Sequence, residues 1–388
     1  MFALRTFNLM STAAANCIRP FPASLSVCAL RGDVKVMDQC ADEWRNLCAE
    51  SENDQPFYRP EWIGAHIRAF SPAAKIVLIT TRLNGRLHLV LPLLEEKSTF
   101  SKVPVRKLRA PVSLHCGRFD VVRSAGPEGD EAVDATWDYL RKSGGWDMLQ
   151  LNYTPRDGTS GHLAALARAD GFHTTRVPER PSPYIPIPYE PGLWRKVPPN
   201  SKLRSQLTQV YKRLGEGGAL RLRRIDAADP AALDRFYQLE ASGWKGRDGS
   251  AIACNRSKKQ FFDEIARCAA AHGYFALYML EWKGQLMAAH FSLVLQGRCY
   301  SPKVAYDEQF RQFAPGHLII NEILKDCAAR RIVVLDIMGE DDAWKMKWTS
   351  QACPVDHYMV FNGPRGKLAY NLGLRFKPAI GRLFQRKS

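Results

Sequence analysis

Three apolar segments in the second half of the chain are separated by two-residue turns, and this succession restricts the fold more than any other feature. The segments span residues 274–280, 286–295 and 298–303, and the turns are Lys283-Gly284 and Gln296-Gly297. Connections this short permit only an antiparallel meander. A helix from Pro315 to about Arg330 then leads into a buried strand at 332–337, and a helical crossover of this kind predicts a parallel pair. A last strand at 355–361 completes the set.

The first half of the chain repeats part of this order. Residues 76–82 and 86–94 flank Asn84-Gly85, which is typical of a tight hairpin. A segment that begins at Gly145 matches the later buried strand. Similarity at a spacing of roughly 190 residues indicates duplication. The sequence therefore predicts an α/β fold with tandem related domains, each a mostly antiparallel mixed sheet with one parallel crossover pair and flanking helices.

Eight prolines between residues 178 and 199 mark the predicted domain boundary. A segment so rich in proline cannot hold a helix, and we expect an extended connector there. The predicted division has a disordered or misassigned extension (1–30), a degenerate first domain (31–190), a second domain (191–362) and a basic amphipathic tail (363–388). The first 32 residues contain no acid. A transit peptide is therefore the alternative to a plain extension or a start placed too early.

The charge balance favours anionic partners. Lysine and arginine number 55 against 39 acidic residues, which gives a net charge of +16. This surplus fits nucleotide phosphates, nucleic acid, acidic glycans or an anionic membrane, without selecting one. The ten cysteines form no CxxC pair, so we expect them to be reduced. With no apolar run of about 18 residues, we expect a cytoplasmic protein, and peripheral contact with the inner membrane is the alternative.

A family resemblance lies in the motifs between Tyr300 and Trp348. The motifs are Tyr300-Ser-Pro-Lys303-Val-Ala-Tyr306-Asp307, Ala314-Pro315-Gly316-His317-Leu318, Leu335-Asp336-Ile337 and Asp341-Asp342-Ala343-Trp344-Lys345, with Asn200-Ser-Lys-Leu-Arg204 and Gly243-Trp244-Lys245-Gly246 upstream. In this order they resemble the CelD/BcsL-type acetyltransferases of the GNAT superfamily, which are similar to the FemABX aminoacyltransferases. The resemblance covers about residues 30–362. The family usually has Tyr-Lys where this chain has Trp344-Lys345, so a role for a tyrosine hydroxyl is not carried over there.

The resemblance implies a transferase. It implies transfer of an acetyl or other acyl group from acyl-CoA to an amine or hydroxyl of a sugar or envelope polysaccharide precursor, by direct attack with general-base help. One alternative is a FemABX-like transferase that uses aminoacyl-tRNA, the one case in which we expect a nucleic-acid partner. Another is a non-catalytic accessory protein of polysaccharide assembly.

The donor is expected at the start of the helix that opens at Gly316, because a helix N-terminus presents free N–H groups to phosphate. The GNAT pattern Gln/Arg-x-x-Gly-x-Gly/Ala is kept there only in part. The residues expected to bind acyl-CoA are Arg311, Ala314, Gly316, His317 and Leu318. Pro-Gly before a helix is also ordinary turn chemistry, which is the structural alternative.

Proton transfer needs a carboxylate whose pKa suits a base. Asp307, Glu240 and Asp336 are the candidate bases, and Tyr306 is the candidate acid for a departing thiolate. A purely structural role is the alternative for each of these residues. Asp307 can begin a turn, Glu240 can pair with Lys245, and a tyrosine at a strand end can simply pack.

Substrate contacts are expected from cations and from indole rings. The residues are Lys303, Lys345, Lys245, Lys202, Arg204, Trp244 and Trp344. Residues 195–224 hold nine basic residues and one acid. They either receive phosphates of the donor or of a nucleotide-linked acceptor, or form the solvated face of an amphipathic helix.

No metal site is expected, because the nine histidines are scattered and no HExxH motif occurs. Residues 365–388 hold seven basic residues and no acid, interleaved with apolar residues. This pattern fits either a helix that contacts an anionic membrane or a tail that packs across the two domains.

Overall fold

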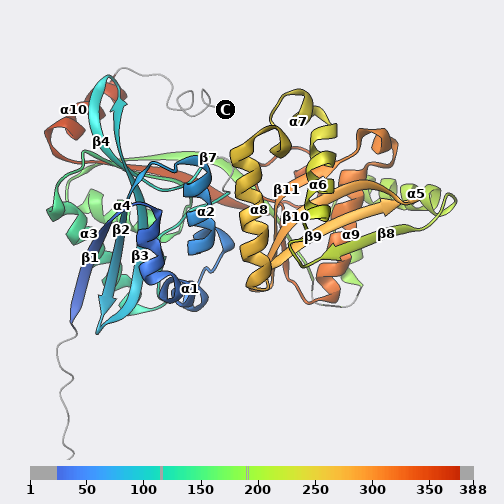
Figure 1. Cartoon of the computed structure of the whole chain (residues 1–388), viewed down its shortest axis with the longest axis horizontal. Coiled ribbons are helices and arrows are strands. Elements are labelled where there is room, and N and C mark those ends of the chain that lie inside the picture. The colour runs from blue at the N-terminus through green and yellow to red at the C-terminus, as the bar shows by residue number, and fades with distance from the viewer. Residues whose placement is uncertain (1–23, 114–116, 189, 191, 376–388) are drawn as a thin grey trace, which may run out of the picture.

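The computed structural model describes residues 24–113, 117–188, 190 and 192–375, which form two lobes (Figure 1). The first lobe contains, in chain order, β1 (Leu25–Gly32), α1 (Ala41–Glu50), α2 (Pro60–Phe70), β2 (Lys75–Leu83), β3 (Arg86–Phe100), β4 (Val103–Arg109), β5 (Val122–Arg123), α3 (Pro127–Ser143), β6 (Met148–Pro155), α4 (Thr159–Ala169) and β7 (His173–Pro186). The chain continues with α5 (Ser201–Gly215), β8 (Leu220–Ile225), α6 (Pro230–Ser242), α7 (Trp244–Arg247), α8 (Arg256–Ala271), β9 (Phe275–Trp282), β10 (Gln285–Leu295), β11 (Arg298–Tyr306), α9 (Pro315–Ala329), β12 (Val334–Asp336), β13 (Ala352–Phe361) and α10 (Gly363–Arg375). The predicted mixed α/β fold is confirmed.

The two lobes repeat one order of elements. Each has an antiparallel meander, β2–β3–β4 or β9–β10–β11, followed by a crossover helix, α3 or α9. The crossover ends in a strand parallel to the last meander strand, β6 beside β4 and β12 beside β11. The three predicted hairpin turns have positive φ at both residues, as at Asn84 (52°) and Gly85 (81°). Turns of that kind match the twist of the strands they join.

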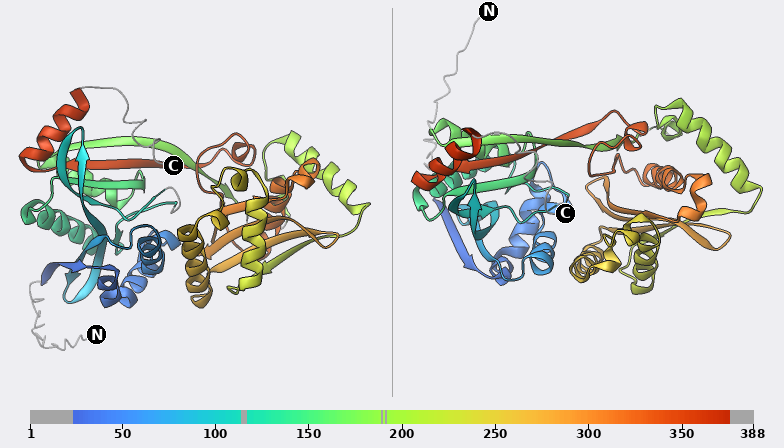
Figure 2. Two further views of the ribbon diagram at one scale, coloured as in Figure 1. Left: turned by 45° about the horizontal axis from the view of Figure 1, so that its top comes forward. Right: turned by 90° about the horizontal axis from the view of Figure 1, so that it is seen from above.

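The lobes exchange strands at their junction. In the order β4–β6–β13–β7–β12–β11, the last strand of the chain, β13, lies between β6 and β7. β7 pairs with β13 along its first part and with β12 at Tyr184–Pro186. Figure 2 shows β7 and β13 running between the lobes. Residues 355–361, which we predicted to close the second domain, therefore contribute their strand to the sheet of the first lobe. The predicted connector begins as β7.

Side chains from both lobes share one hydrophobic core. The ring centroids of Trp62 in α2 and Phe261 in α8 lie 5.0 Å apart, and those of Phe57 and Tyr300 in β11 lie 5.4 Å apart. All four belong to the same buried cluster. Edge-to-face ring pairs of this kind add to the burial of apolar surface. The pairing of α2 with α8 therefore fixes the lobes beside each other.

Candidate functional site

The second half of β11 has a free edge. β11 pairs with β12 only from Arg298 to Tyr300, because β12 ends at Asp336. The Asp307 amide donates to Met287 of β10, so by strand alternation Val304 and Tyr306 direct their backbone groups away from β10. The Val304 carbonyl confirms this direction, since it accepts from Lys245 Nζ at 3.1 Å. A free strand edge offers hydrogen bonds to an extended ligand.

A cavity of about 470 Å³ opens beside this free edge. We call it the α9 pocket, because the start of α9 forms one wall and the α6–α7 junction forms another. It brings together most of the predicted residues: Glu240, Trp244, Lys245, Tyr306, Arg311, Ala314, Gly316, His317 and Trp344. The predicted residues Lys202, Arg204, Asp307, Lys303, Asp336, Leu318 and Lys345 do not line it.

The start of α9 is an uncapped helix N-terminus. Ala314 has left-handed φ and ψ of 49° and 55°, and its side chain accepts no hydrogen bond. Pro315 has no N–H, and His317 and Leu318 donate to the Ala314 carbonyl. Within the described part of the chain, the Gly316 amide has no such acceptor. Leu318 itself is buried in the core, so it supports the helix and does not face the pocket.

His317 is held as a neutral imidazole. The Trp348 indole N–H donates to His317 Nδ1 at 2.9 Å, so the ring proton resides on Nε2. Burial and the nearby Lys347 charge lower the pKa of His317 to about 4. The side chain therefore offers an N–H donor at neutral pH. It is not a base.

Glu240 and Lys245 satisfy each other. Lys245 Nζ donates to Glu240 Oε1 at 2.9 Å, and the Ile252 amide donates to Oε2 at 2.8 Å. Both carboxylate oxygens are therefore occupied, and the Glu240 side chain is 2% exposed. Because Lys245 also binds the Val304 carbonyl, the pair fixes α7 to the free edge of β11. The structure gives Glu240 the role of a buried ion-pair partner, not that of a free base.

Asp336 forms a buried ion pair across the lobes. Arg118, from the first lobe, donates to its two carboxylate oxygens at 2.7 and 3.1 Å, and the Met338 amide adds a third bond at 3.1 Å. The two side chains are 3% and 1% exposed. The pair joins the lobes, and the structure places Asp336 in an ion pair and not as an exposed base. The partner could not be read from the sequence, because Arg118 lies 218 residues away.

Asp307 caps the short 3₁₀ helix η5 (Glu308–Phe313). One of its oxygens accepts from the Gln309 amide at 2.9 Å. It directly follows Tyr306, which lines the α9 pocket and is 40% exposed. Of the three predicted bases, Asp307 therefore keeps a carboxylate oxygen outside ion pairs, close to the pocket.

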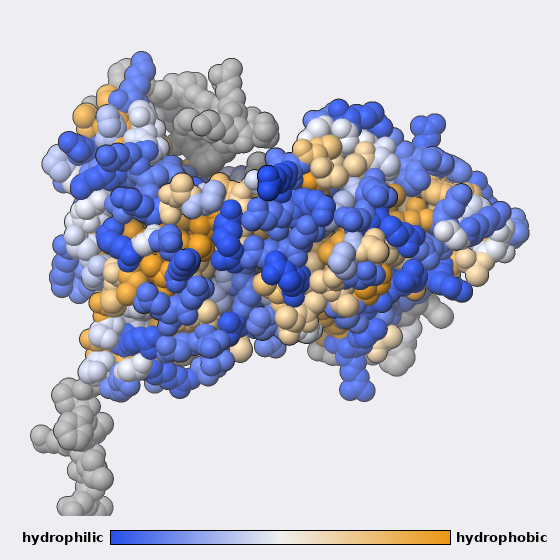
Figure 3. Space-filling model, in the orientation of Figure 1, coloured by the Kyte–Doolittle hydropathy of each residue, from blue (hydrophilic) through white to orange (hydrophobic). Residues whose placement is uncertain are grey.

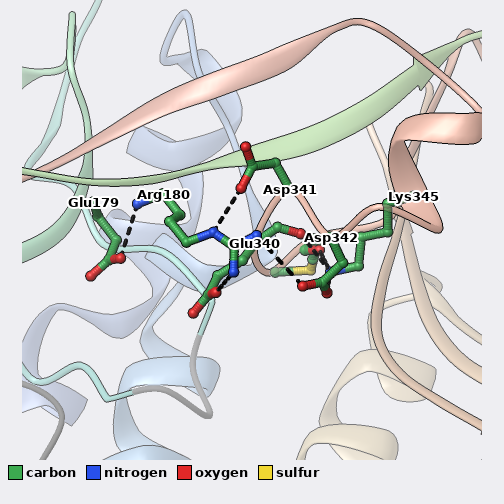
Figure 4. A network of polar contacts seen from close by, with 7 residues as sticks. Glu179, Arg180, Glu340, Asp341, Asp342 and Lys345 are labelled. Carbon is green, nitrogen blue, oxygen red and sulfur yellow. Dashed lines mark hydrogen bonds and ion pairs between the residues drawn. The ribbon is translucent and has the colours of Figure 1, made fainter.

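A second cavity of about 410 Å³ lies between the lobes. We call it the inter-lobe pocket; it takes Gly117, Tyr153 and Arg180 from the first lobe and Lys303 and Met338 from the second. At its mouth Arg180 contacts Glu340 and binds Asp341 at 2.8 Å (Figure 4). Lys303 and Val304 are consecutive in β11, yet one lines the inter-lobe pocket and the other the α9 pocket. The two cavities are therefore lined by neighbouring residues of β11.

Lys345 is a structural cation. Its Nζ donates to the carbonyls of Met338 and Glu340 at 2.9 Å each and lies 3.3 Å from Asp342 (Figure 4). Lys202 is exposed at the start of α5, and Arg204 donates to the Pro198 carbonyl at 2.6 Å. These three predicted substrate residues therefore lie outside the α9 pocket.

Three non-glycine residues that line the pockets have left-handed backbone. They are Ala314 of the α9 pocket (φ 49°), which begins α9, and Tyr153 (55°) and Met338 (50°) of the inter-lobe pocket. Such conformations cost free energy, and they persist at sites where function requires a particular backbone path. Tyr153 and Met338 lie outside the motifs on which the family resemblance rests, and Trp348 ends the segment that begins at Tyr300 but was given no role.

The first lobe has no open counterpart of the α9 start. α3 also begins with proline, but Glu128 and Asp130 occupy its first turn, where α9 has no acid. Glu128 follows the proline of α3 as Gly316 follows that of α9. A Cβ at Gly129 would lie 1.9 Å from the Ser124 carbonyl oxygen, so this turn is closed by backbone. Negative charge at a helix N-terminus repels phosphate, and the second lobe alone offers an open one at this position.

No cluster of metal ligands exists among the described residues. In the same part of the chain, none of the helices is long and apolar enough to cross a bilayer.

Comparison with known proteins identifies the fold. Residues 201–346 match the family model described as "Acetyltransferase (GNAT) domain". No curated protein sequence matches the chain. Among solved structures, FemX has a TM-score of 0.59 at 13% identity, over 85% of this chain and 98% of that one. The C-terminal domain of a putative lysylphosphatidylglycerol synthetase from Agrobacterium fabrum has a TM-score of 0.51 at 9% identity, over 86% and 94%.

A protein of unknown function from Bacteroides thetaiotaomicron has a TM-score of 0.53 at 9% identity, over 83% of this chain and 97% of that one. These likenesses concern the fold of both lobes together. The family match falls on the lobe that carries the α9 pocket. Residues 201–346 are therefore similar to a GNAT acetyltransferase domain, and they lie within a two-lobed fold similar to that of FemX.

Proposed function

We propose that the protein transfers an acyl group from acyl-CoA, bound in the α9 pocket, to an amine or hydroxyl of an acceptor in the inter-lobe pocket. One observation carries this proposal: the uncapped start of α9 and the free edge of β11 face the same cavity. The GNAT match over residues 201–346 supports the reaction class. Acetyl-CoA is the simplest donor of this class.

The pocket residues fit the parts of such a donor. The Gly316 amide and the Arg311 side chain would receive phosphate oxygens at the positive end of α9. The Val304 N–H and the backbone groups of Tyr306 would pair with the amides of an extended pantetheine arm, as an added strand would. His317 Nε2–H would donate to an oxygen of the donor, and the indoles of Trp244 and Trp344 supply apolar walls.

The acceptor would react beside Lys303 and Val304 of β11, which line the inter-lobe pocket and the α9 pocket respectively. Its nitrogen or oxygen attacks the thioester carbonyl carbon, the new C–N or C–O bond forms, and the C–S bond breaks. Asp307 would take the proton of the attacking group, directly or through one water, and Tyr306 would protonate the departing thiolate. The polar mouth around Arg180 supports a polar acceptor, and we propose a sugar or an envelope polysaccharide precursor.

Calorimetry tests the donor assignment. Acetyl-CoA and longer acyl-CoAs should bind saturably, and absence of binding by every CoA ester would refute the proposal. Once an acceptor is found, Asp307→Asn should lower kcat while leaving donor affinity unchanged. Full turnover in this variant would exclude Asp307 as the base.

A second candidate donor is aminoacyl-tRNA. The similarity in fold to FemX and the nine basic residues of 195–224 favour this reading. Contacts with many phosphates make affinity fall steeply with salt, by about 0.7–0.9 in log K per phosphate for each decade of salt. A steep slope with a charged tRNA, together with no binding of acyl-CoA, would select this donor over the first.

A further inference from the structure

α10 presents two leucines outward. Ala369 is fully buried against the sheet. A Cβ added at Gly366 would lie 2.4 Å from a backbone oxygen of the first lobe, and one added at Gly373 would lie 2.5 Å from a side-chain oxygen there. On the opposite side, Leu368 and Leu372 are 51% and 36% exposed. A surface helix ordinarily turns its leucines toward the core, whereas in α10 Tyr370 packs inward and both of these leucines are exposed.

The other exposed large apolar side chains lie outside α10. Among the described residues they are Leu25, Trp244, Tyr306 and Met346. Trp244 and Tyr306 line the α9 pocket, where a donor would cover them. The leucines of α10 lie on the first lobe and outside that pocket, and Figure 3 shows apolar surface over α10 among hydrophilic residues. They therefore need an occupant of their own.

Charge indicates what that occupant is. Arg365 and Lys367 are exposed beside the two leucines. Residues 363–388 contain seven lysines and arginines and no aspartate or glutamate, and the sequence after α10 continues with Phe376, Ile380, Leu383 and Phe384 between cations. An apolar face flanked by cations complements an anionic bilayer surface. A second copy of the same face would bring like charges together, which disfavours self-association.

We propose that the outer face of α10, formed by Arg365, Lys367, Leu368 and Leu372, docks the protein on an anionic lipid bilayer. The leucines enter the boundary between headgroups and acyl chains, and the two cations lie against the headgroups. This proposal is independent of the proposed donor chemistry, because α10 packs against strands β4 and β13 of the first-lobe sheet and does not line the α9 pocket.

Sedimentation of the full chain with lipid vesicles tests the proposal. One set of vesicles contains phosphatidylcholine alone, and the other contains one part phosphatidylglycerol to two parts phosphatidylcholine. We expect binding to the mixed vesicles only, weakened by salt as screening shortens the reach of the charges. Lys367→Glu should lower the partition coefficient roughly fivefold or more. Leu368→Ser with Leu372→Ser should lower it at least about tenfold, since two apolar side chains leave the interface.

Leu25→Ser is the matched control, because Leu25 is 39% exposed but lies on β1. It should bind vesicles as the unchanged protein does. Equal binding by the double-serine variant, equal binding to both vesicle types, or no binding by the unchanged chain would each overturn the proposal. So would a dimer in solution that the double-serine variant abolishes. Thermal unfolding and acyl-CoA titration of each variant should match the unchanged protein, which separates a docking defect from loss of fold or donor site.

Discussion

Gly316→Ala separates donor binding from folding. Gly316 follows Pro315 in the first turn of α9, and its backbone is not in a left-handed conformation. An added Cβ would meet only the Tyr306 ring, at an ordinary contact distance of 3.8 Å. The protein can therefore accept the methyl group without strain. The same methyl group would stand in the α9 pocket, next to the amide proposed to receive phosphate.

The two expected effects have opposite signs. Alanine costs less chain entropy than glycine, so the free energy of unfolding should rise by about 0.5 kcal/mol. For a protein of this size that corresponds to roughly 0.5–1 °C in Tm. Donor affinity should fall at least about tenfold, or about 1.4 kcal/mol, because the methyl group keeps the phosphate from the Gly316 amide. Calorimetric titration with acetyl-CoA and a thermal melt measure the two quantities on one sample.

Gly215→Ala provides the control. Gly215 ends α5, has open space around its Cβ position, and lies outside the α9 pocket. It should raise Tm slightly and leave donor affinity unchanged. If Gly316→Ala kept the donor affinity of the unchanged protein while its Tm rose as expected, the donor phosphates would not lie at the start of α9.

Three further predictions concern buried polar groups. Asp336→Asn should lower the free energy of unfolding, measured by urea titration, by about 3–5 kcal/mol, because Arg118 is left as an unpaired buried charge. Loss of activity with unchanged stability would instead indicate that Asp336 is a base. Burial lowers the pKa of His290 to about 3 and that of His317 to about 4, so the unfolded chain binds protons that the folded chain does not. Stability should therefore be full above about pH 6.5 and fall as pH decreases toward 4, and a flat profile in urea titrations at several pH values would contradict this. Trp348→Phe should weaken donor binding by about fivefold, since His317 loses the hydrogen bond that fixes its tautomer; unchanged affinity would remove His317 from the donor contacts.

The local order of the second lobe was readable from the sequence. The meander and the crossover depend on neighbours in the chain, and its turns carry the residue types that positive φ favours. The α9 pocket followed from the same order, because Tyr306, Arg311 and Gly316 are close in sequence. The sequence left two roles open for Glu240, a catalytic base or an ion-pair partner of Lys245, and it could not decide between them. Distance and burial decide between those readings, and a sequence contains neither.

The strand in the proline-rich segment was not readable. Prolines usually exclude a central strand, because each removes a ladder donor. β7 is an exception because β13 pairs with one of its edges over the first part of the strand, whereas β12 pairs with its other edge only at Tyr184–Pro186. Much of β7 therefore has one unpaired edge, where a missing N–H costs little. The partner strand β13 begins at Ala352, more than a whole lobe later in the chain, and no local pattern encodes that pairing.

The position of β13 also sets the order of events during synthesis. The first lobe leaves the ribosome with β6 and β7 made and the strand between them still to come. Its sheet can be completed only after residues 352–361 emerge, when almost the whole chain has been translated. Contacts of such sequence separation slow folding and keep strand edges exposed in the meantime. A nascent chain halted in the second lobe should therefore depend on chaperones, and a shortened gene encoding the first lobe alone should yield an aggregating product.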